Sequence, residues 1–282
     1  MYLQHFGFHT QPFSQTPNTE LFLGLAPHFE AIQTVMAALD MGEGIVKVTG
    51  EVGTGKTMVC RMLIDQLSDK VNLVYLPNPV LSGHELQMAI AREMGLKTYD
   101  SVSLVPLIQD RLIGMRQRGM RTVLLVDEAQ ALPLEAMEAL RLFGNLETEQ
   151  EKLLQIVLFG QPELDERIAQ HELRQFRQRI TFSCQLRPLT IEEGVAFIDS
   201  RLAKAGDGEH QYLTTEQKKA LWRGAGGIPR LINQLCHKAF LLAYMQQQKN
   251  VTNQHLFTAI HDTYDACKPL FKTPVLWGWR AS

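Results

Sequence analysis

Two patterns of hydrophobic positions alternate along the first two thirds of the chain. Short apolar runs, rich in β-branched residues, are separated by longer segments whose apolar residues recur at helical spacing. The short runs predict buried strands within 44–50, 71–76, 122–130, 152–164 and 179–186. The longer segments predict helices at 28–42, 56–67, 82–95, 103–119 and 133–146. Alternating strands and helices indicate a mostly parallel sheet that is covered on both faces.

The pattern changes near Pro188, after which only helical periodicity is seen. These later segments are 188–206, 214–226, 228–248 and 252–265. A small all-helical domain is therefore expected after the sheet domain. The predicted boundaries give an α/β domain at 1–187, which includes an aromatic, proline-punctuated lead-in, a helical domain at 188–266, and an irregular tail at 267–282.

The first predicted strand is joined to the next helix by a loop that fits G-x-x-x-x-G-K-[ST] without a mismatch. Glycines allow successive N–H groups to converge on an anion, and the helix N-terminus favours negative charge. The residues expected to contact the phosphates are Gly50, Glu51, Val52, Gly53, Thr54, Gly55, Lys56 and Thr57. Lys56 would reach the β- and γ-phosphates and Thr57 would ligate the metal, so the expected cofactors are ATP and Mg²⁺.

Two acids, Asp127 and Glu128, end the third predicted strand. An acid at this place in P-loop proteins holds the Mg²⁺ shell, which assigns Asp127 to the metal. A second acid beside it is suited to activating a water, so Glu128 argues for hydrolysis rather than for a small-molecule kinase. The "DEAQ" stretch also resembles a helicase box, but that alternative needs a second sheet domain, for which the helical C-terminal region has no room.

Further polar candidates follow the last two strands and begin a late helix. Gln161, just past a strand, either senses the γ-phosphate or belongs to an ordinary strand-to-helix turn. Arg177 and Arg179 precede the last strand, and Arg230 starts a helix in the small domain. Because a phosphoryl transition state spreads negative charge over the γ-oxygens, an arginine supplied in trans stabilises it. The plainer alternative for each arginine is a solvated or locally paired side chain.

Composition limits the partners. Net charge is −2 and the pI is about 6.5, so no overall basic character points to nucleic acid. The four cysteines are far apart and predict no cysteine-based metal or redox site. A cluster of arginines could form a local patch for nucleic acid or phospholipid, or an exposed helix end; it comprises Arg111, Arg116, Arg118 and Arg121. Trp277 and Trp279 in the tail either mark an interface or fold back on their own domain.

The combined motifs resemble the AAA+ ATPases. The stretches "HFGFHTQPFSQTP", "GEVGTGKT", "LLVDEAQ", "FGQPEL", "LRQFRQRI", "LRPLT" and "GGIPRLINQLC" are similar to the ExeA/GspA family of secretion ATPases, and within it to its short members of MSHA-pilus biogenesis. The resemblance covers the chain to about residue 265. It implies a P-loop AAA+ three-layer sandwich with a five-stranded parallel sheet, a helical lid and ring-like, hexameric homo-oligomers.

The resemblance also implies residue roles: Asp127 for Mg²⁺, Glu128 for water activation, Gln161 as the first sensor, Arg230 as the lid sensor, and Arg179 or Arg177 as the finger. Long family members continue into a membrane span and a peptidoglycan-binding part. The sequence given stops at Ser282, so we expect that a wall-binding role does not apply.

The expected function is an ATPase that assembles or remodels a type IV (MSHA-like) pilus or a type II secretion complex. Its partners would be assembly proteins at the cytoplasmic face of the inner membrane. The chain start lacks a signal-peptide pattern and no run is apolar enough to span a bilayer, so we expect a cytoplasmic protein, with peripheral membrane association left open. The alternative is a DNA-associated AAA+ switch of the transposition-helper type, against which the acidic pI argues.

Overall fold

The computed structural model describes residues 2–14, 23–79, 81–97, 104–148, 151–206 and 210–270. The chain divides into two units, each of which is described here by itself. An α/β unit contains His28–Val52 and Lys56–Leu186. A helical unit contains Met1–Pro27, Gly53–Gly55 and Arg187–Ser282.

The α/β unit is built on a five-stranded sheet with the order β2-β3-β4-β1-β5. The strands are β1 (Ile45–Gly50), β2 (Val71–Leu76), β3 (Arg121–Val126), β4 (Leu154–Gly160) and β5 (Ile180–Leu186). Every neighbouring pair is parallel, with Val126 opposite Leu158 and Thr49 opposite Gly160. The carboxyl ends of β3, β4 and β1 therefore follow one another along a single edge of the sheet.

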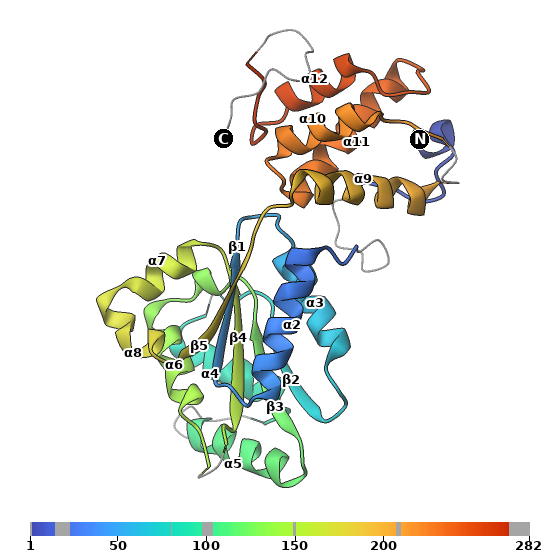
Figure 1. Ribbon diagram of the computed structural model, residues 1–282. Helices are drawn as coiled ribbons and strands as arrows, with labels where there is room; N and C mark the ends of the chain where they lie inside the picture. The colour runs from blue at the N-terminus through green and yellow to red at the C-terminus, as the bar shows by residue number, and fades with distance from the viewer. Residues whose placement is uncertain are drawn as a thin grey trace. The chain divides into compact units, whose positions relative to one another are not determined.

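Helices cover both faces of this sheet, as Figure 1 shows. One face packs against α2 (Ala26–Asp40) and α3 (Lys56–Gln66). The other face is covered by α4 (Gly83–Glu93), α5 (Leu104–Gln117), α6 (Leu134–Gly144), α7 (Glu163–Ala169) and α8 (Arg174–Arg177). Successive residues of a strand point to opposite faces of the sheet. Val48 of β1 lies in the core on the side of α2 and α3, and Leu158 of β4 lies in the core on the other side. The apolar character of both faces explains why the strands read as nearly continuous hydrophobic runs.

The helical unit consists mainly of four helices. They are α9 (Ile191–Ala205), α10 (Thr215–Ala225), α11 (Pro229–Met245) and α12 (Asn253–His261). Thr190 caps α9, since its hydroxyl accepts from the Glu193 N–H and the Glu193 carboxylate accepts from the Thr190 N–H. Thr214 and Gln217 form the same reciprocal box at the start of α10. These local signals fix where the helices begin.

The aromatic lead-in belongs to the helical unit. Its helix α1 (Tyr2–Phe6) packs against α11, and the Phe6 ring meets Phe240 edge-on at 5.0 Å. Burial raises the pKa of Tyr2 to about 12, so its hydroxyl stays protonated and lies 3.1 Å from His237 Nδ1. The sequence prediction that residues 1–187 form one domain with this lead-in was therefore wrong at its start, because the aromatic side chains find their core on α11.

The five parallel strands and the helical C-terminal part were predicted from the sequence, and the structure confirms this fold class. It adds short elements that periodicity did not reveal. They are α1, α7, α8, η2 (Ala129–Ala131) and η3 (His171–Leu173). Most of the predicted tail at 267–282, including Trp277 and Trp279, lies outside the described residues.

We expect Gly194→Ala to destabilise the helical unit. A Cβ at this position in α9 would lie 2.3 Å from Trp222 Cδ1. The Trp222 ring cannot easily move away, because its Nε1–H donates to the Leu189 carbonyl at 2.8 Å. The overpacking should cost about 1–3 kcal/mol, measured by urea unfolding. A matched control is Gly114→Ala in α5, where a Cβ would meet nothing within 4 Å.

The control should gain about 0.5–1 kcal/mol, because alanine loses less conformational entropy in a helix than glycine does. An equal gain for both variants would contradict the predicted clash with Trp222.

Candidate nucleotide site

The loop between β1 and α3 has the backbone that its sequence predicted. Gly53 and Gly55 adopt φ values of +86° and +107°, a region that residues with a Cβ rarely enter. Lys56 is the first residue of α3, so the loop ends at the N-terminus of an 11-residue helix. Free N–H groups and the helix dipole at such an end favour a phosphate.

Lys56 is held inside this loop. Its side chain is buried, and its Nζ donates to the carbonyl oxygens of Gly50 at 2.7 Å and Glu51 at 3.1 Å. Burial lowers the pKa of Lys56, while the nearby carboxylates of Glu128 and Asp127 oppose that shift. The ammonium is thus positioned by backbone atoms in a partly desolvated place, where its attraction for an anion is stronger than in water.

Asp127 meets the P-loop helix across the sheet edge. The Thr57 hydroxyl donates to Asp127 Oδ2 at 2.9 Å, and the Glu128 N–H donates to Asp127 Oδ1 at 2.9 Å. Burial raises the pKa of Asp127 above its usual value, although these two hydrogen bonds partly oppose the shift. A divalent cation shared by Thr57 and Asp127 would favour the ionised carboxylate. The structure therefore brings together the two residues that the sequence assigned to the metal.

Glu128 lies next to Asp127 and bonds in the other direction, toward β4. Its backbone is left-handed, with φ 52° and ψ 38°, which is uncommon for a residue other than glycine. Its Oε2 accepts a hydrogen bond from Gln161 Nε2 at 3.1 Å. The Gln130 amide also donates to this oxygen. Gln130 was missed by the sequence interpretation, although its place in "DEAQ" was a signal that could have been used.

The residues present fit a magnesium–nucleotide. The left-handed glycines and Lys56 form a cradle suited to phosphate oxygens. The paired Thr57 hydroxyl and Asp127 carboxylate supply the hard oxygen ligands that Mg²⁺ prefers. Glu128, one residue further on, is free to serve as a separate group rather than as part of the metal shell.

The candidate arginines lie in different places. Arg177 in α8 donates from Nη1 to the Ala169 carbonyl at 3.2 Å. Arg179 is exposed just before β5, and it helps lower the pKa of Glu147, for which the hydrogen bond from Lys152 is the main cause. Arg230 lies in the first turn of α11 in the helical unit. Neither arginine that precedes β5 shares a hydrogen bond with the acids at the end of β3 within the described part of the chain.

Two members of the basic cluster at α5 and β3 are engaged by acids. Arg116 Nε donates to Glu151 at 2.9 Å, and Arg121 Nη2 lies 3.1 Å from Asp40. Arg121 also donates to the Leu39 carbonyl. These two ion pairs reduce the positive field of the cluster, which would otherwise favour a polyanion.

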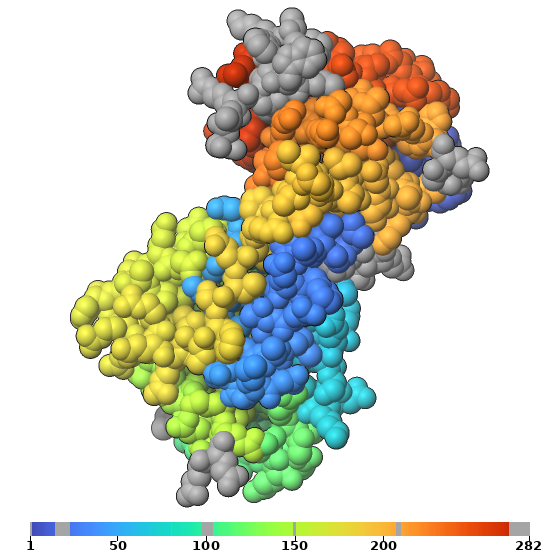
Figure 2. Space-filling view, viewed as in Figure 1, coloured from blue at the N-terminus to red at the C-terminus, as the bar shows by residue number. Residues whose placement is uncertain are grey.

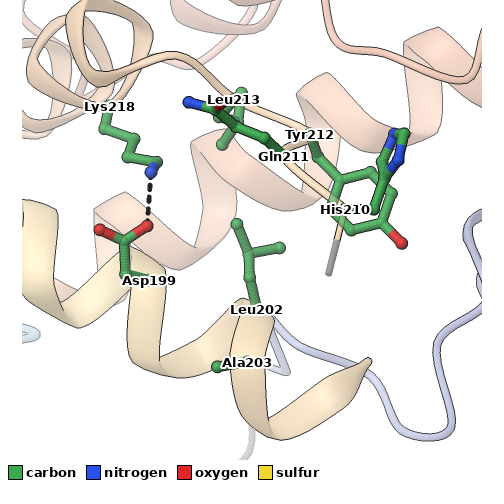
Figure 3. Close-up of a pocket in the computed structure, with 8 residues that line it drawn as sticks. All are labelled: Asp199, Leu202, Ala203, His210, Gln211, Tyr212, Leu213 and Lys218. Carbon is green, nitrogen blue, oxygen red and sulfur yellow. Dashed lines mark ion pairs between the residues drawn. The ribbon is translucent and has the colours of Figure 1, made fainter. Parts of the chain in front are cut away.

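A separate pocket of about 310 Å³ lies within the helical unit (Figure 3). Its lining includes Asp199, Leu202, His210, Gln211, Tyr212 and Lys218. The Lys218 ammonium points at the Asp199 carboxylate, with which it forms an ion pair. These two charges satisfy each other, and nothing at this pocket matches the phosphate chemistry of the P-loop.

The family comparisons agree with this geometry. A model of the AAA domain family matches residues 39–168, which include the P-loop, Asp127 and Gln161. General secretion pathway protein A of Aeromonas hydrophila is 40% identical over 266 residues, which cover 93% of this chain. The chain is therefore similar to an AAA domain around the P-loop and to a general secretion pathway protein A over most of its length. The chain spans about half of that relative's length, 48%.

Solved structures show the same AAA fold at low sequence identity. The Aeropyrum pernix ORC2 protein matches with a TM-score of 0.65 and 14% identity, over 92% of this chain and 72% of that one. Cdc6p of Pyrobaculum aerophilum matches with a TM-score of 0.68 and 16% identity, over 88% of this chain and 69% of that one. The Thermotoga maritima RuvB branch migration motor matches with a TM-score of 0.52 and 17% identity, over 89% of this chain and 73% of that one. At these identities the likeness concerns the fold alone.

Within the described residues, no helix combines the length and the apolar character that crossing a bilayer requires.

We expect Lys56→Ala to weaken ATP binding by about tenfold or more. The variant loses a charged donor to phosphate, and a hydrogen bond to a charged group contributes about 1.5–3 kcal/mol. Isothermal titration calorimetry measures the change directly. Lys70→Ala is the matched control, since Lys70 is an exposed lysine of the same unit. Equal affinity of the two variants for ATP would exclude the P-loop assignment.

Proposed function

We propose that this chain hydrolyses ATP and uses the cycle to assemble or remodel a type IV (MSHA-like) pilus or type II secretion complex. It would act at the cytoplasmic face of the inner membrane, on assembly proteins located there. The ATPase part of the proposal rests on one observation, which is that two adjacent acids make different contacts. Asp127 bonds to Thr57 of the P-loop helix, and Glu128 bonds to Gln161 at the end of β4.

This division suits hydrolysis better than phosphoryl transfer to a bound acceptor. When bound, magnesium–ATP supplies the γ-phosphoryl group and a divalent charge that neutralises it. Lys56 and the loop amides hold and orient the phosphates. Glu128 would orient a water and take its proton, and Gln161, which donates to Glu128 Oε2, would hold that carboxylate. A kinase has a substrate hydroxyl in that position and does not require the second acid.

The secretion and pilus part of the proposal is supported by the relative from Aeromonas hydrophila, whose printed name refers to the general secretion pathway. The finer resemblance to the MSHA biogenesis protein MshM is part of this proposal. A DNA-associated AAA+ switch is the alternative class. The net charge of −2 and the pairing of Arg116 and Arg121 with acids count against this alternative.

The ATPase part is tested with Glu128→Gln. We expect ATP binding to persist, because Lys56, Thr57 and Asp127 are unchanged, and kcat to fall by about 10²–10⁴-fold, the usual contribution of a general base. Calorimetry and phosphate release measure the two quantities. Glu172→Gln, at an exposed glutamate of η3, is the control and should turn over ATP normally. Normal turnover by Glu128→Gln would assign the base to another residue.

The same variant tests the partner class, because an ATP-bound, slowly hydrolysing protein keeps its partners. It should retain pilus or secretion assembly proteins from membrane extracts in the presence of ATP, whereas Lys56→Ala should not. ATP-dependent and salt-sensitive binding of duplex DNA by the trapped protein, without such partners, would favour the DNA-associated alternative.

The oligomeric part of the proposal assigns one arginine to the neighbouring subunit. The segment from α7 to β5, drawn in yellow-green and yellow, lies at the surface of the α/β unit (Figure 2). Arg177 is engaged by the Ala169 carbonyl, which makes exposed Arg179 the better candidate finger. Arg230 would act from the helical lid as the second sensor, and a hexameric ring would place the finger against the next site.

We expect Arg179→Ala to bind ATP normally and to lose about 10³–10⁵-fold in turnover, the usual range for an arginine finger. Mixing it with Lys56→Ala should restore part of the activity, because some interfaces then pair an intact P-loop with an intact finger. The rate per subunit of the unchanged protein should rise with concentration. Phosphate release across a dilution series measures both effects.

Arg177→Ala serves as the comparison and should keep its turnover. A loss confined to Arg177→Ala, with rescue on mixing, would move the finger to that residue. A rate per subunit that stays constant on dilution to monomer, with no rescue, would mean that one chain contains a complete site.

A further inference from the structure

Gln130 bridges the two polar ends of the site. It lies in η2, the single 3₁₀ turn that follows β3 and Glu128. Its side-chain amide is used at both ends: Nε2 donates to Glu128 Oε2, and Oε1 accepts from the Gln161 N–H at 3.0 Å. The amide therefore ties the Glu128 carboxylate to the backbone at the end of β4.

The surroundings of Gln130 leave it little freedom. Arg167 of α7 donates to the Gln130 backbone carbonyl, and the Ala131 N–H donates to the Glu128 carbonyl at 2.9 Å. On the β4 side, the missing side chain of Gly160 leaves room for the Gln130 amide, since a Cβ there would lie 3.3 Å from Gln130 Oε1 and 2.6 Å from Leu164 Cδ2. Both the turn and the amide are thus fixed by groups outside the P-loop.

Both amide donors reach the same oxygen of Glu128. Gln130 and Gln161 donate to Oε2, and within the described residues no hydrogen bond to Oε1 is present. Two donors on one oxygen restrict rotation of the carboxylate, while the second oxygen keeps its lone pairs. This arrangement is suited to a base that must present one oxygen in one direction.

We propose that Gln130 is a positioning residue for hydrolysis, which orients Glu128 so that Oε1 faces the attacking water. This inference rests on the proposed ATPase function. Glutamine suits the role because one side chain must donate to a carboxylate and accept from a backbone N–H. Asparagine is one methylene shorter, and a charged side chain has only one of the two capacities. The unusual left-handed backbone of Glu128 is consistent with a side chain whose direction matters.

A purely structural role predicts a different result. If Gln130 only closed the turn between η2 and β4, its loss would lower stability, with ATP affinity and turnover falling together as folded protein is lost. A positioning role predicts that the affinity for ATP is unchanged while kcat falls. The groups that contact Gln130 and carry charge are Glu128 and Arg167, so a new carboxylate at this position repels Glu128 and attracts Arg167.

The experiment compares Gln130→Ala and Gln130→Glu with the unchanged chain. For Gln130→Ala we expect kcat to fall about 10- to 100-fold, as for small misplacements of a reacting group, with ATP affinity by calorimetry within about twofold. Gln130→Glu preserves the size of the side chain but places a second carboxylate against Glu128. Gln170→Glu, at an exposed glutamine that follows α7, is the control for an added charge.

The pH profile separates positioning from general damage. At pH 8 the carboxylate introduced by Gln130→Glu is ionised, cannot donate and repels Glu128, so kcat should be low. As pH falls, a growing fraction of this carboxylate is protonated, and in that form it can donate to Glu128 again. The ratio of kcat for this variant to kcat for the unchanged protein should therefore rise as pH falls, whereas the ratio for Gln170→Glu should stay constant.

Three failures are distinguishable. Turnover by the unchanged protein, with Gln130→Ala and Gln130→Glu matching it at every pH, would overturn the positioning role alone. Binding of ATP by the unchanged protein without any turnover would overturn the proposed ATPase function and the role of Gln130 with it. A parallel loss of affinity, thermal stability and kcat in both variants would favour the structural role and overturn the inference.

Discussion

The hydrogen bond from the Thr57 hydroxyl to the Asp127 carboxylate joins two parts of the site that come from separate βα units. It can form only because β1 and β3 run in the same direction on either side of β4. Gln161 leaves the strand between them, and so it reaches the acids that follow β3. The order of the strands, more than the P-loop alone, decides which side chains meet.

This dependence explains which parts of the site were predictable. The P-loop is contiguous, and its glycines and lysine identify the phosphate cradle from sequence alone. Asp127 and Glu128 are also recognisable, because they end an apolar strand. Gln130 stands in the "DEAQ" stretch, but that stretch alone does not indicate its role, which comes from a hydrogen bond to the backbone of Gln161, 31 residues away. In the sequence, Gln130 is one polar residue of a turn, and only the folded structure places the end of β4 beside it.

The same reasoning applies to the fold. The predicted strands and longer helices had a clear hydrophobic period, and the structure confirms the five-stranded parallel sheet and the helical C-terminal part. The lead-in had abundant aromatic residues but no period long enough to indicate a partner. Its neighbours in sequence suggested the α/β domain, whereas its side chains pack with Phe240. Arg177 and Arg179 could not be separated from sequence, since the hydrogen bond from Arg177 to the Ala169 carbonyl exists only in the folded chain.

The docked lead-in has a consequence for synthesis on the ribosome. Every residue of the five-stranded sheet has been made once Leu186 is added, so the α/β unit can fold while the chain is still growing. Tyr2, Phe6 and Phe8 precede the sheet in the chain, and they must remain without their core until Phe240 has been made. Their apolar side chains therefore lack that core while the whole α/β unit is synthesised. The nascent chain thus exposes an apolar segment that chaperones can recognise, and the helical unit is completed only after the α/β unit.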